Sequence, residues 1–171
     1  MIASDKDPTK TQGEALCKSC GLCCYAFHNL GLIADEEERN IVEAFGGKLF
    51  TNASGALSFS QPCPAYRGLC TVHPGHPASC QSYQCKLLKR VLQGGIPPEE
   101  ALEVVTKLKV EVALIDSALK KTMGERIEIV DDYIANFLSQ ADDDKRMGNP
   151  ELLLHFGVYK HMRKRYFDLS D

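Results

Sequence analysis

The stretch "CKSCGLCC", Cys17 to Cys24, places four thiols within eight residues near the start of the chain. Cys17, Cys20 and Cys23 form a C-x2-C-x2-C run, a spacing that lets thiolates from one tight turn reach a common iron–sulfur cluster. A C-x2-C half of that run is equally the knuckle of a structural zinc site. Four thiolates this close would repel each other unless a cation neutralised them. The spacing therefore predicts a metal centre and leaves the metal open.

The adjacent cysteines at the end of this stretch raise a second question. If the chain is extended at Cys23 and Cys24, their side chains point to opposite faces and serve different partners. If the chain is helical, Cys17, Cys20 and Cys24 share one stripe, with Cys23 beside them. The sequence leaves both conformations open.

The other four cysteines lie in "QPCPAYRGLCTVHPGHPASCQSYQC", residues 61 to 85, which contains four prolines and two glycines. Regular structure is not expected there, and bound metal could hold such a loop in place. A four-thiolate zinc site or a [4Fe–4S] cluster uses about four cysteines, so eight suit two centres, or one centre plus four other sulfurs. The predicted ligands are Cys17, Cys20, Cys23, Cys24, Cys63, Cys70, Cys80 and Cys85.

Composition limits the class of protein. The 171 residues allow one domain of ordinary size, and 44% apolar content is enough for a core. A net charge of −3 argues against nucleic acid or an anionic membrane as partner. The opening "MIASDKDPTKTQGEA" lacks the apolar core of a signal peptide. We therefore expect a cytoplasmic protein, in which dense cysteine more often binds metal than forms disulfides.

Three regions are predicted along the chain: a flexible polar tail at 1–13, a cysteine-cluster metal-binding region at 14–93 and a helical region at 96–168. In the second region we expect a short strand within 25–33 and a helix over 36–45 that Asp35 caps. Two short strands should flank the turn "NASG" in "KLFTNASGALSFS".

Three helices are expected in the last region, where apolar residues recur every three or four positions. The first begins at Pro97 and Pro98 and ends at Gly124, with the stripe Leu102, Val105, Leu108, Val112, Ile115 and Leu119. The second spans about 126 to 140, burying Ile127, Val130, Ile134 and Phe137. The third starts at the Asn149 cap and Pro150, burying Leu152, Phe156, Tyr159 and Met162. The predicted fold is α+β and mainly helical, with the small cysteine-rich part packed on these helices and sharing their core.

The histidines and the basic C-terminal run receive ordinary structural interpretations. His73 and His76 in "HPGHP" are expected to make loop hydrogen bonds, because eight thiols already satisfy two centres. His28, His155 and His161 have no partner that the sequence identifies. The cations of "KHMRKRYFD", Lys160 and Arg163 to Arg165, complement the dipole of a helix end rather than indicate nucleic-acid binding.

The cluster "CKSCGLCC" followed by "CPAYRGLCTVHPGHPASCQSYQC" resembles the CxxCxxCC cysteine-cluster proteins (YkgJ type), a family described as zinc- or iron-chelating and as containing iron–sulfur clusters. The stretch "HNLGLIADEEERNIVEAFGG" is similar to the strand and helix that follow the cluster in that family. The resemblance covers about residues 17 to 90 and implies that all eight cysteines are ligands. The chain departs from the family at His76-Pro77 and Cys80-Gln81, where arginines are usual.

Three functions are compatible with these features. The first is a protein that holds one or two iron–sulfur clusters, [4Fe–4S] being the expected type, for electron transfer or to support a modification reaction. The second is a zinc-binding interaction module with two four-cysteine sites. The third, which the resemblance implies, is a methylase-like modifying enzyme with a metal cluster. The expected partners are metal ions and a protein bound by the helical part, with neither nucleic acid nor membrane.

Overall fold

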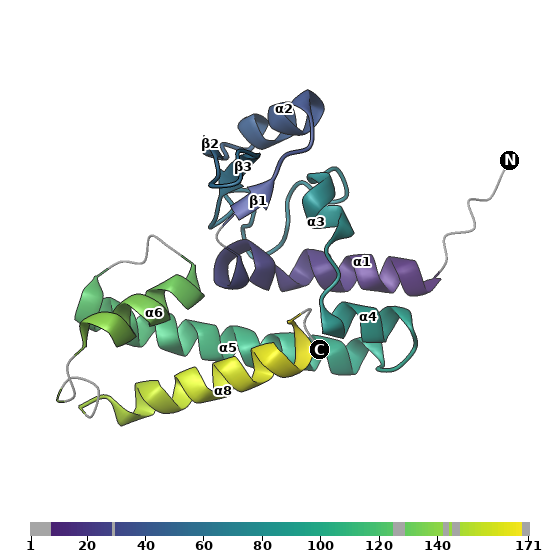
Figure 1. The fold of residues 1–171 in the computed structure, drawn as a ribbon. Coiled ribbons are helices and arrows are strands. Elements are labelled where there is room, and N and C mark those ends of the chain that lie inside the picture. The colour runs from purple at the N-terminus through teal and green to yellow at the C-terminus, as the bar shows by residue number, and fades with distance from the viewer. Residues whose placement is uncertain (1–7, 29, 125–128, 142–143, 145–147, 169–171) are drawn as a thin grey trace, which may run out of the picture.

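Helices make up most of the fold, and a small sheet interrupts them between residues 30 and 60 (Figure 1). The computed structural model describes residues 8–28, 30–124, 129–141, 144 and 148–168. The elements are α1 (Pro8–Cys20), the π-helix η1 (Cys23–Phe27), β1 (Leu30–Leu32), α2 (Glu36–Ala44), β2 (Leu49–Thr51), β3 (Leu57–Ser60), α3 (Ala78–Ser82), α4 (Lys86–Leu92), α5 (Pro98–Met123), α6 (Val130–Gln140) and α8 (Pro150–Tyr166). The predicted α+β, mainly helical fold class is confirmed.

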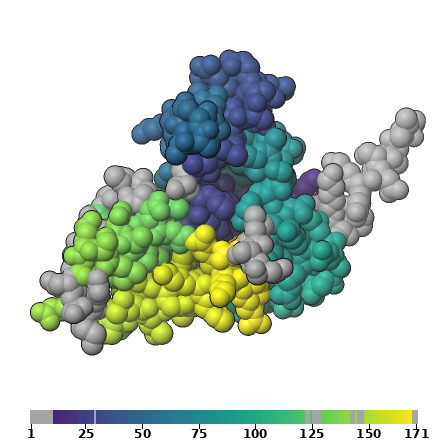
Figure 2. Space-filling view, viewed as in Figure 1, coloured from purple at the N-terminus to yellow at the C-terminus, as the bar shows by residue number. Residues whose placement is uncertain are grey.

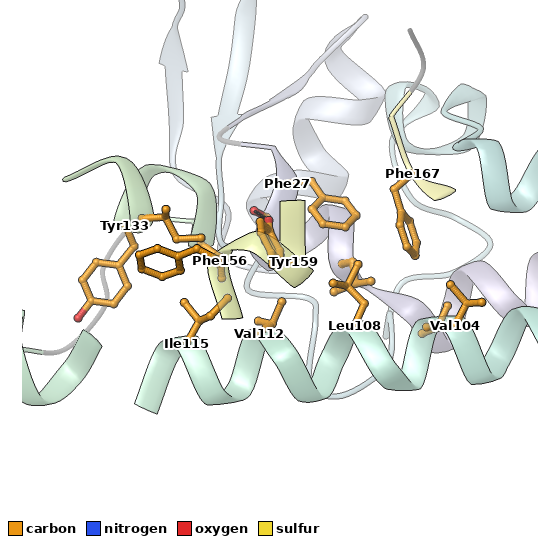
Figure 3. Packing of buried hydrophobic residues seen from close by; sticks show 14 of the residues in the cluster. Phe27, Val104, Leu108, Val112, Ile115, Tyr133, Phe156, Tyr159 and Phe167 are labelled. Atoms are coloured by element: carbon orange, nitrogen blue, oxygen red, sulfur yellow. Dashed lines mark hydrogen bonds between the residues drawn. The ribbon is translucent and has the colours of Figure 1, made fainter. Parts of the chain in front are cut away.

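The long helix α5 is the centre of the main hydrophobic core, and Figure 3 shows its side chains packing against α6, α8 and Phe27. The predicted stripe from Val105 to Leu119 is buried, but Leu102 is 47% exposed and does not belong to it. Leu102 lies two steps of three residues before Leu108. At about 100° per residue, its side chain therefore points about 120° away from that of Leu108 on the buried face. Ala101, fully buried, takes its place because steps of four and three alternate from there.

Helices α6 and α8 cover the same core as predicted. Most of the expected inward residues are buried, namely Val130, Ile134, Phe137, Leu152, Phe156 and Tyr159, whereas Met162 is only partly buried. Pro150 occupies the first turn of α8 and Asn149 precedes it. Residues 125–128, including the predicted core residue Ile127, lie outside the described part of the chain.

The three strands form an antiparallel sheet in the order β1-β3-β2 and have a small core of their own. Phe59 of β3 pairs with Gly31 on one side and Leu49 on the other. A side chain at Gly31 would overlap the ring of Phe59, so the sheet needs glycine there. Phe59 packs with Ile33, which follows β1, and with Val42 of α2. Figure 2 shows this part of the chain as a lobe that projects from the helical body.

The sequence predicts that the cysteine region and the helices share one core, but the structure has two hydrophobic clusters. Leu16, Phe27 and Leu87 of the cysteine region do pack in the core of α5, but Ile33, Val42 and Phe59 form a separate cluster. In Figure 1, α1 lies between the sheet and α5. One core therefore serves the helices and part of the cysteine region, and a second serves the sheet.

Two local predictions near the N-terminus are also corrected. Residues 8–13, placed in a flexible tail, form the first turns of α1, and Gly13 there packs against Leu88 and Leu92 of α4. Residues 1–7 lie outside the described part. The strand expected within 25–33 is limited to Leu30–Leu32, because Cys23–Phe27 continue as a π-helix whose Ala26 and Phe27 are buried. In both cases contacts with distant helices outweigh the local pattern.

Candidate metal centre

The first four cysteines are placed by two helical segments that meet at a glycine. Cys17 and Cys20 lie in the last turn and a half of α1, and Cys23 and Cys24 begin η1. Gly21, between them, has a φ of +66°, a left-handed conformation that glycine adopts without a steric penalty. The chain is thus helical on both sides of Gly21 but turns there, so the four thiols do not form one continuous helical stripe.

Tyr66 of the second cysteine segment packs directly on this turn. Its ring covers Gly21 so closely that a Cβ at that position would overlap it. The Tyr66 hydroxyl donates to the Cys20 carbonyl at 3.3 Å, and the ring stacks on Tyr25 with centroids 5.1 Å apart. Gly21 and Tyr66 together therefore dock residues 63–70 onto the end of α1.

Backbone hydrogen bonds from two cysteines complete this docking. The Cys63 N–H donates to the Cys24 carbonyl at 2.8 Å, and the Cys70 N–H donates to the Lys18 carbonyl at 3.0 Å. Lys18 lies in the last turn of α1, where carbonyls lack a partner within the helix, and the Cys70 amide supplies one. The two cysteine segments, some 40 residues apart in sequence, are thereby brought together.

Cys80 and Cys85 are anchored to different parts of the molecule. Cys80 lies in α3, where the buried Glu38 carboxylate accepts from the Ala78 N–H and the Ser79 hydroxyl donates to the Leu32 carbonyl at 2.8 Å. Glu38 also accepts from the Ala34 N–H at 2.7 Å, next to the confirmed Asp35 cap of α2. Cys85 instead caps α4, its Sγ accepting from the Leu88 N–H at 3.4 Å.

A cavity of about 320 Å³ lies among these thiols, and its other walls are mainly apolar. Leu16, Leu30, Leu87 and Phe167 contribute to the apolar walls. Seven of the eight predicted ligands line it: Cys17, Cys20, Cys23, Cys24, Cys70, Cys80 and Cys85. Cys63 adjoins them through its hydrogen bond to Cys24. The structure therefore gathers the cysteines of both segments around one space.

Burial keeps these thiols protonated when no cation is present. It is the largest cause that raises the pKa of Cys17 to about 11, of Cys20 to about 12 and of Cys80 to about 11. The pKa values of Cys23 and Cys24 are raised further, again mainly by burial and then by neighbouring thiolates. Ionised thiols here need a compensating positive charge, which a metal would supply while displacing the protons.

Within the described part of the chain, no three His, Cys, Asp or Glu side chains are placed so that they could hold a single metal ion. Four thiolates around one zinc ion would have their sulfurs only about 3.8 Å apart, given a zinc–sulfur distance of about 2.3 Å in a tetrahedron. The cysteines instead surround the cavity. The volume of that cavity, about 320 Å³, leaves room for a group of several atoms.

Two polar atoms in the cavity wall were not identified from the sequence. His28 Nε2 and Gln61 Oε1 are buried and have no hydrogen-bond partner among the described residues. The His28 ring packs edge-on against Tyr83, with centroids 4.8 Å apart, and burial lowers its pKa. Buried polar groups are normally paired, so these two atoms are available to a ligand in the cavity.

Lys109 of α5 is a second residue that the sequence did not indicate. Its Nζ donates to the Ser19 carbonyl at 3.1 Å and to the Tyr66 hydroxyl at 2.9 Å, at the C-terminal end of α1. Its charge acts to lower the pKa of Cys20, against the larger effect of burial. Because it reaches the site from 90 residues away, only the tertiary fold could reveal it.

The remaining histidines and the basic C-terminal run make ordinary structural contacts. His76 Nδ1 lies 2.9 Å from the Pro74 carbonyl, the loop hydrogen bond that was expected, and its ring packs on His73. His155 pairs with Glu111 at 2.7 Å, a partner that the sequence did not identify. Arg163, from the basic run, contacts the carboxylates of Asp131 and Asp168 near the end of α8.

Comparison with known proteins gives no direct guide to the chain's function. No protein-family model, no curated protein and no solved structure matches it. None of the helices in the described ranges combines the length and apolar character needed to cross a bilayer. Function is therefore inferred from the cysteine site itself.

Proposed function

We propose that this protein binds iron–sulfur clusters through its eight cysteines and belongs to the CxxCxxCC cysteine-cluster family that its sequence resembles. The observation that carries the proposal is the cavity in which cysteines from residues 17–24 and 70–85 converge. Eight thiols packed into one place by separate segments are unusual unless they share a ligand. The buried, mainly apolar walls suit a cluster that is shielded from water and transfers electrons or supports a modification reaction.

Two features favour a cluster over single zinc ions. Seven of the thiols line a space of about 320 Å³, which is larger than a single ion needs. In addition, Cys17, Cys20 and Cys23 have the spacing of cluster-binding turns. A cluster carries bridging sulfides as well as iron, so it fills more space than an ion and sets its cysteines further apart.

Lys109 offers the charge that a thiolate-bound cluster requires nearby. Thiolates and sulfides give such a cluster a net negative charge, and the usual family arginines are absent around Cys80. Lys109, whose Nζ donates to the Ser19 carbonyl and whose charge acts on Cys20, supplies a cation near the site. We infer that it screens the bound cluster.

The test is metal and sulfide analysis of protein purified without oxygen. We expect brown protein with iron and acid-labile sulfide in equal amounts, and bleaching on reduction. His76→Ala is the matched control, because His76 lines the cavity without being a proposed ligand, and it should retain the iron. Protein that contains neither iron nor sulfide, when expressed with an ample iron supply, would contradict the proposal.

Zinc is the alternative, and the irregular course of residues 61–77 favours it. In that stretch the assigned regular structure is a single bridge between Tyr66 and Cys70, so a structural metal would stabilise it. Colourless protein that holds about two zinc ions and releases them to a chelator would support this alternative and exclude the cluster.

A further inference from the structure

The adjacent cysteines Cys23 and Cys24 lie in different surroundings. Cys23 packs against the main core of the helices, as do Cys20 and Cys85. Cys63 and Cys80 pack against the other core, that of the sheet. Cys24 is tied to this second group, because its carbonyl accepts from the Cys63 N–H at 2.8 Å. The doublet therefore stands where the two cores meet.

The electrostatic neighbours of the doublet divide in the same way. The thiols that act most strongly on Cys23 are Cys20 and Cys85. Those that act most strongly on Cys24 are Cys63 and Cys80, followed by Cys70. Since such effects fall with distance, each member of the doublet has its own set of near neighbours.

Cys80 and Cys85 are separated by the same boundary although only four residues lie between them. Cys80 is held to the sheet lobe through α3, by the bonds from Ala78 to Glu38 and from Ser79 to Leu32. Cys85 is the cap of α4, which packs on α1 and contributes Leu87 and Val91 to the main core. The chain thus crosses from one side to the other between these two cysteines.

Cys17 and Cys70 complete the two groups. Cys17 shares α1 with Cys20, and Cys85 is the thiol that acts on it most strongly. Cys70 lies between the two groups, because its N–H donates to the Lys18 carbonyl of α1 at 3.0 Å. It shares one turn with Cys63, whose carbonyl accepts from the Tyr66 N–H at 3.1 Å, and Tyr66 in turn forms a bridge with Cys70. With Cys70 grouped with Cys63 and Cys17 with Cys20, each side has four thiols, the number that one cluster uses.

We propose that the protein holds two metal centres, with the Cys23–Cys24 doublet contributing one ligand to each. The helix-side set is Cys17, Cys20, Cys23 and Cys85, and the sheet-side set is Cys24, Cys63, Cys70 and Cys80. This assignment rests on the proposed metal-binding function and adds which thiols share a centre. The helix-side set uses the whole C-x2-C-x2-C run with one distant cysteine, as in cluster-binding turns.

Pairs of substitutions test the assignment by metal content. Cys20→Ser/Cys85→Ser and Cys63→Ser/Cys80→Ser each remove two ligands from one set, and each should lose about half of the iron found in the unaltered protein. Cys63→Ser/Cys85→Ser removes one ligand from each set and should lose nearly all of it. All three variants lack two cysteines, so the count of thiols is matched. The assignment would be overturned if either variant with both substitutions in one set lost nearly all the iron, or if Cys63→Ser/Cys85→Ser kept half of it.

Thiol labelling of the unaltered protein tests the same assignment without substitution, in case a variant does not fold. Iron is removed stepwise with a chelator, free thiols are alkylated at each step, and the labelled cysteines are identified by mass spectrometry. Each set of four should become reactive together. Labels that appear together on Cys23 and Cys24, with their sets mixed, would refute the assignment. Failure of the proposed function is distinguishable, since the starting protein would then contain neither iron nor sulfide.

Discussion

The helical part and the sheet lobe of this chain are stabilised in different ways. Around α5, more than twenty residues are buried in one hydrophobic cluster, and this packing needs no ligand. The sheet lobe has only Ile33, Val42 and Phe59 fully inside its core, and residues 61–77 have little regular structure. A core of three residues removes too little apolar surface from water to order such a lobe. We therefore propose that bound metal stabilises the sheet lobe, whereas apolar packing stabilises the helical part.

Metal removal should have the largest effect and should separate the two regions. In metal-free, reduced protein we expect the amides of β1–β3 and of Cys63 and Cys70 to lose protection from hydrogen exchange. Amides in the middle of α5 should keep theirs, because apolar packing holds them. Mass spectrometry of exchange with and without metal measures this. Equal protection of the sheet lobe in both states would show that metal contributes nothing to its stability.

Gly21→Ala should be the most damaging single substitution between the two regions. The left-handed φ and the overlap with Tyr66 together predict a loss of about 3 kcal/mol in unfolding free energy, with reduced metal content. Gly55→Ala is the matched control: it has a φ of +83° but no atom near the added Cβ, so it should cost only about 1 kcal/mol. Chemical denaturation of both variants gives the difference. Equal losses would mean that the Tyr66 contact is unimportant.

Leu108→Ala should weaken the helical part without affecting the metal. Leu108 is fully buried in the middle of α5, and truncating such a leucine costs about 3 kcal/mol. Leu102→Ala, on the exposed face of the same helix, should change stability by less than about 0.5 kcal/mol. Urea unfolding measures both, and metal analysis should give unchanged content. Metal loss in Leu108→Ala protein would show that the two regions are more tightly coupled than proposed.

Alkaline pH should destabilise the metal-free protein. Burial raises the pKa of Cys17 to about 11 and of Cys20 to about 12, from 9.0 in the unfolded chain. Above pH 9 the unfolded chain therefore binds fewer protons than the folded one, so stability falls with pH until the folded thiols ionise as well. The expected loss by pH 10 is about 1 kcal/mol for each thiol. Urea unfolding between pH 8 and 10 measures it.

Two controls distinguish this effect from other alkaline titrations. A Cys17→Ala/Cys20→Ala variant, also free of metal, should show a shallower fall over the same range. Metal-bound protein should show less dependence on these thiols, because ligands are already deprotonated. A slope that the double substitution leaves unchanged would assign the pH dependence to other groups.

Tyr159→Phe should have the smallest effect, since it removes hydrogen bonds but little apolar area. The Tyr159 hydroxyl is 3.2 Å from the Ala26 carbonyl and 2.9 Å from Asp131, so it joins α8 to η1 and α6. Losing it should cost about 1 kcal/mol. Tyr166→Phe, at the partly exposed end of α8, should cost less. Thermal unfolding compares the two variants. If Tyr159→Phe lowered stability no more than Tyr166→Phe, the hydrogen bonds of the Tyr159 hydroxyl would not contribute to joining these helices.

Local sequence patterns correctly predicted the helix ends and turns that are set by neighbouring residues. Asp35 caps α2, the turn "NASG" separates β2 from β3, and Gly124 follows the end of α5, as expected. Two predictions failed for different reasons. Leu102 does not belong to the buried stripe of α5, because two steps of three residues turn it away from that face. Residues 8–13 are helical rather than a tail because α4 packs on them, and the local sequence carries no information about that distant neighbour.

By itself, the sequence determined that eight cysteines cluster in two segments and that a long apolar stripe builds a helical scaffold, and it predicted a metal centre at the cysteines. The tertiary structure decided which thiols lie near one another. It turned the chain at Gly21, anchored Cys80 to the sheet and Cys85 to α4, and brought Lys109 to the site. The physical reason is that a ligand set depends on which side chains are near in space, and segments 40 residues apart meet only when their cores have formed.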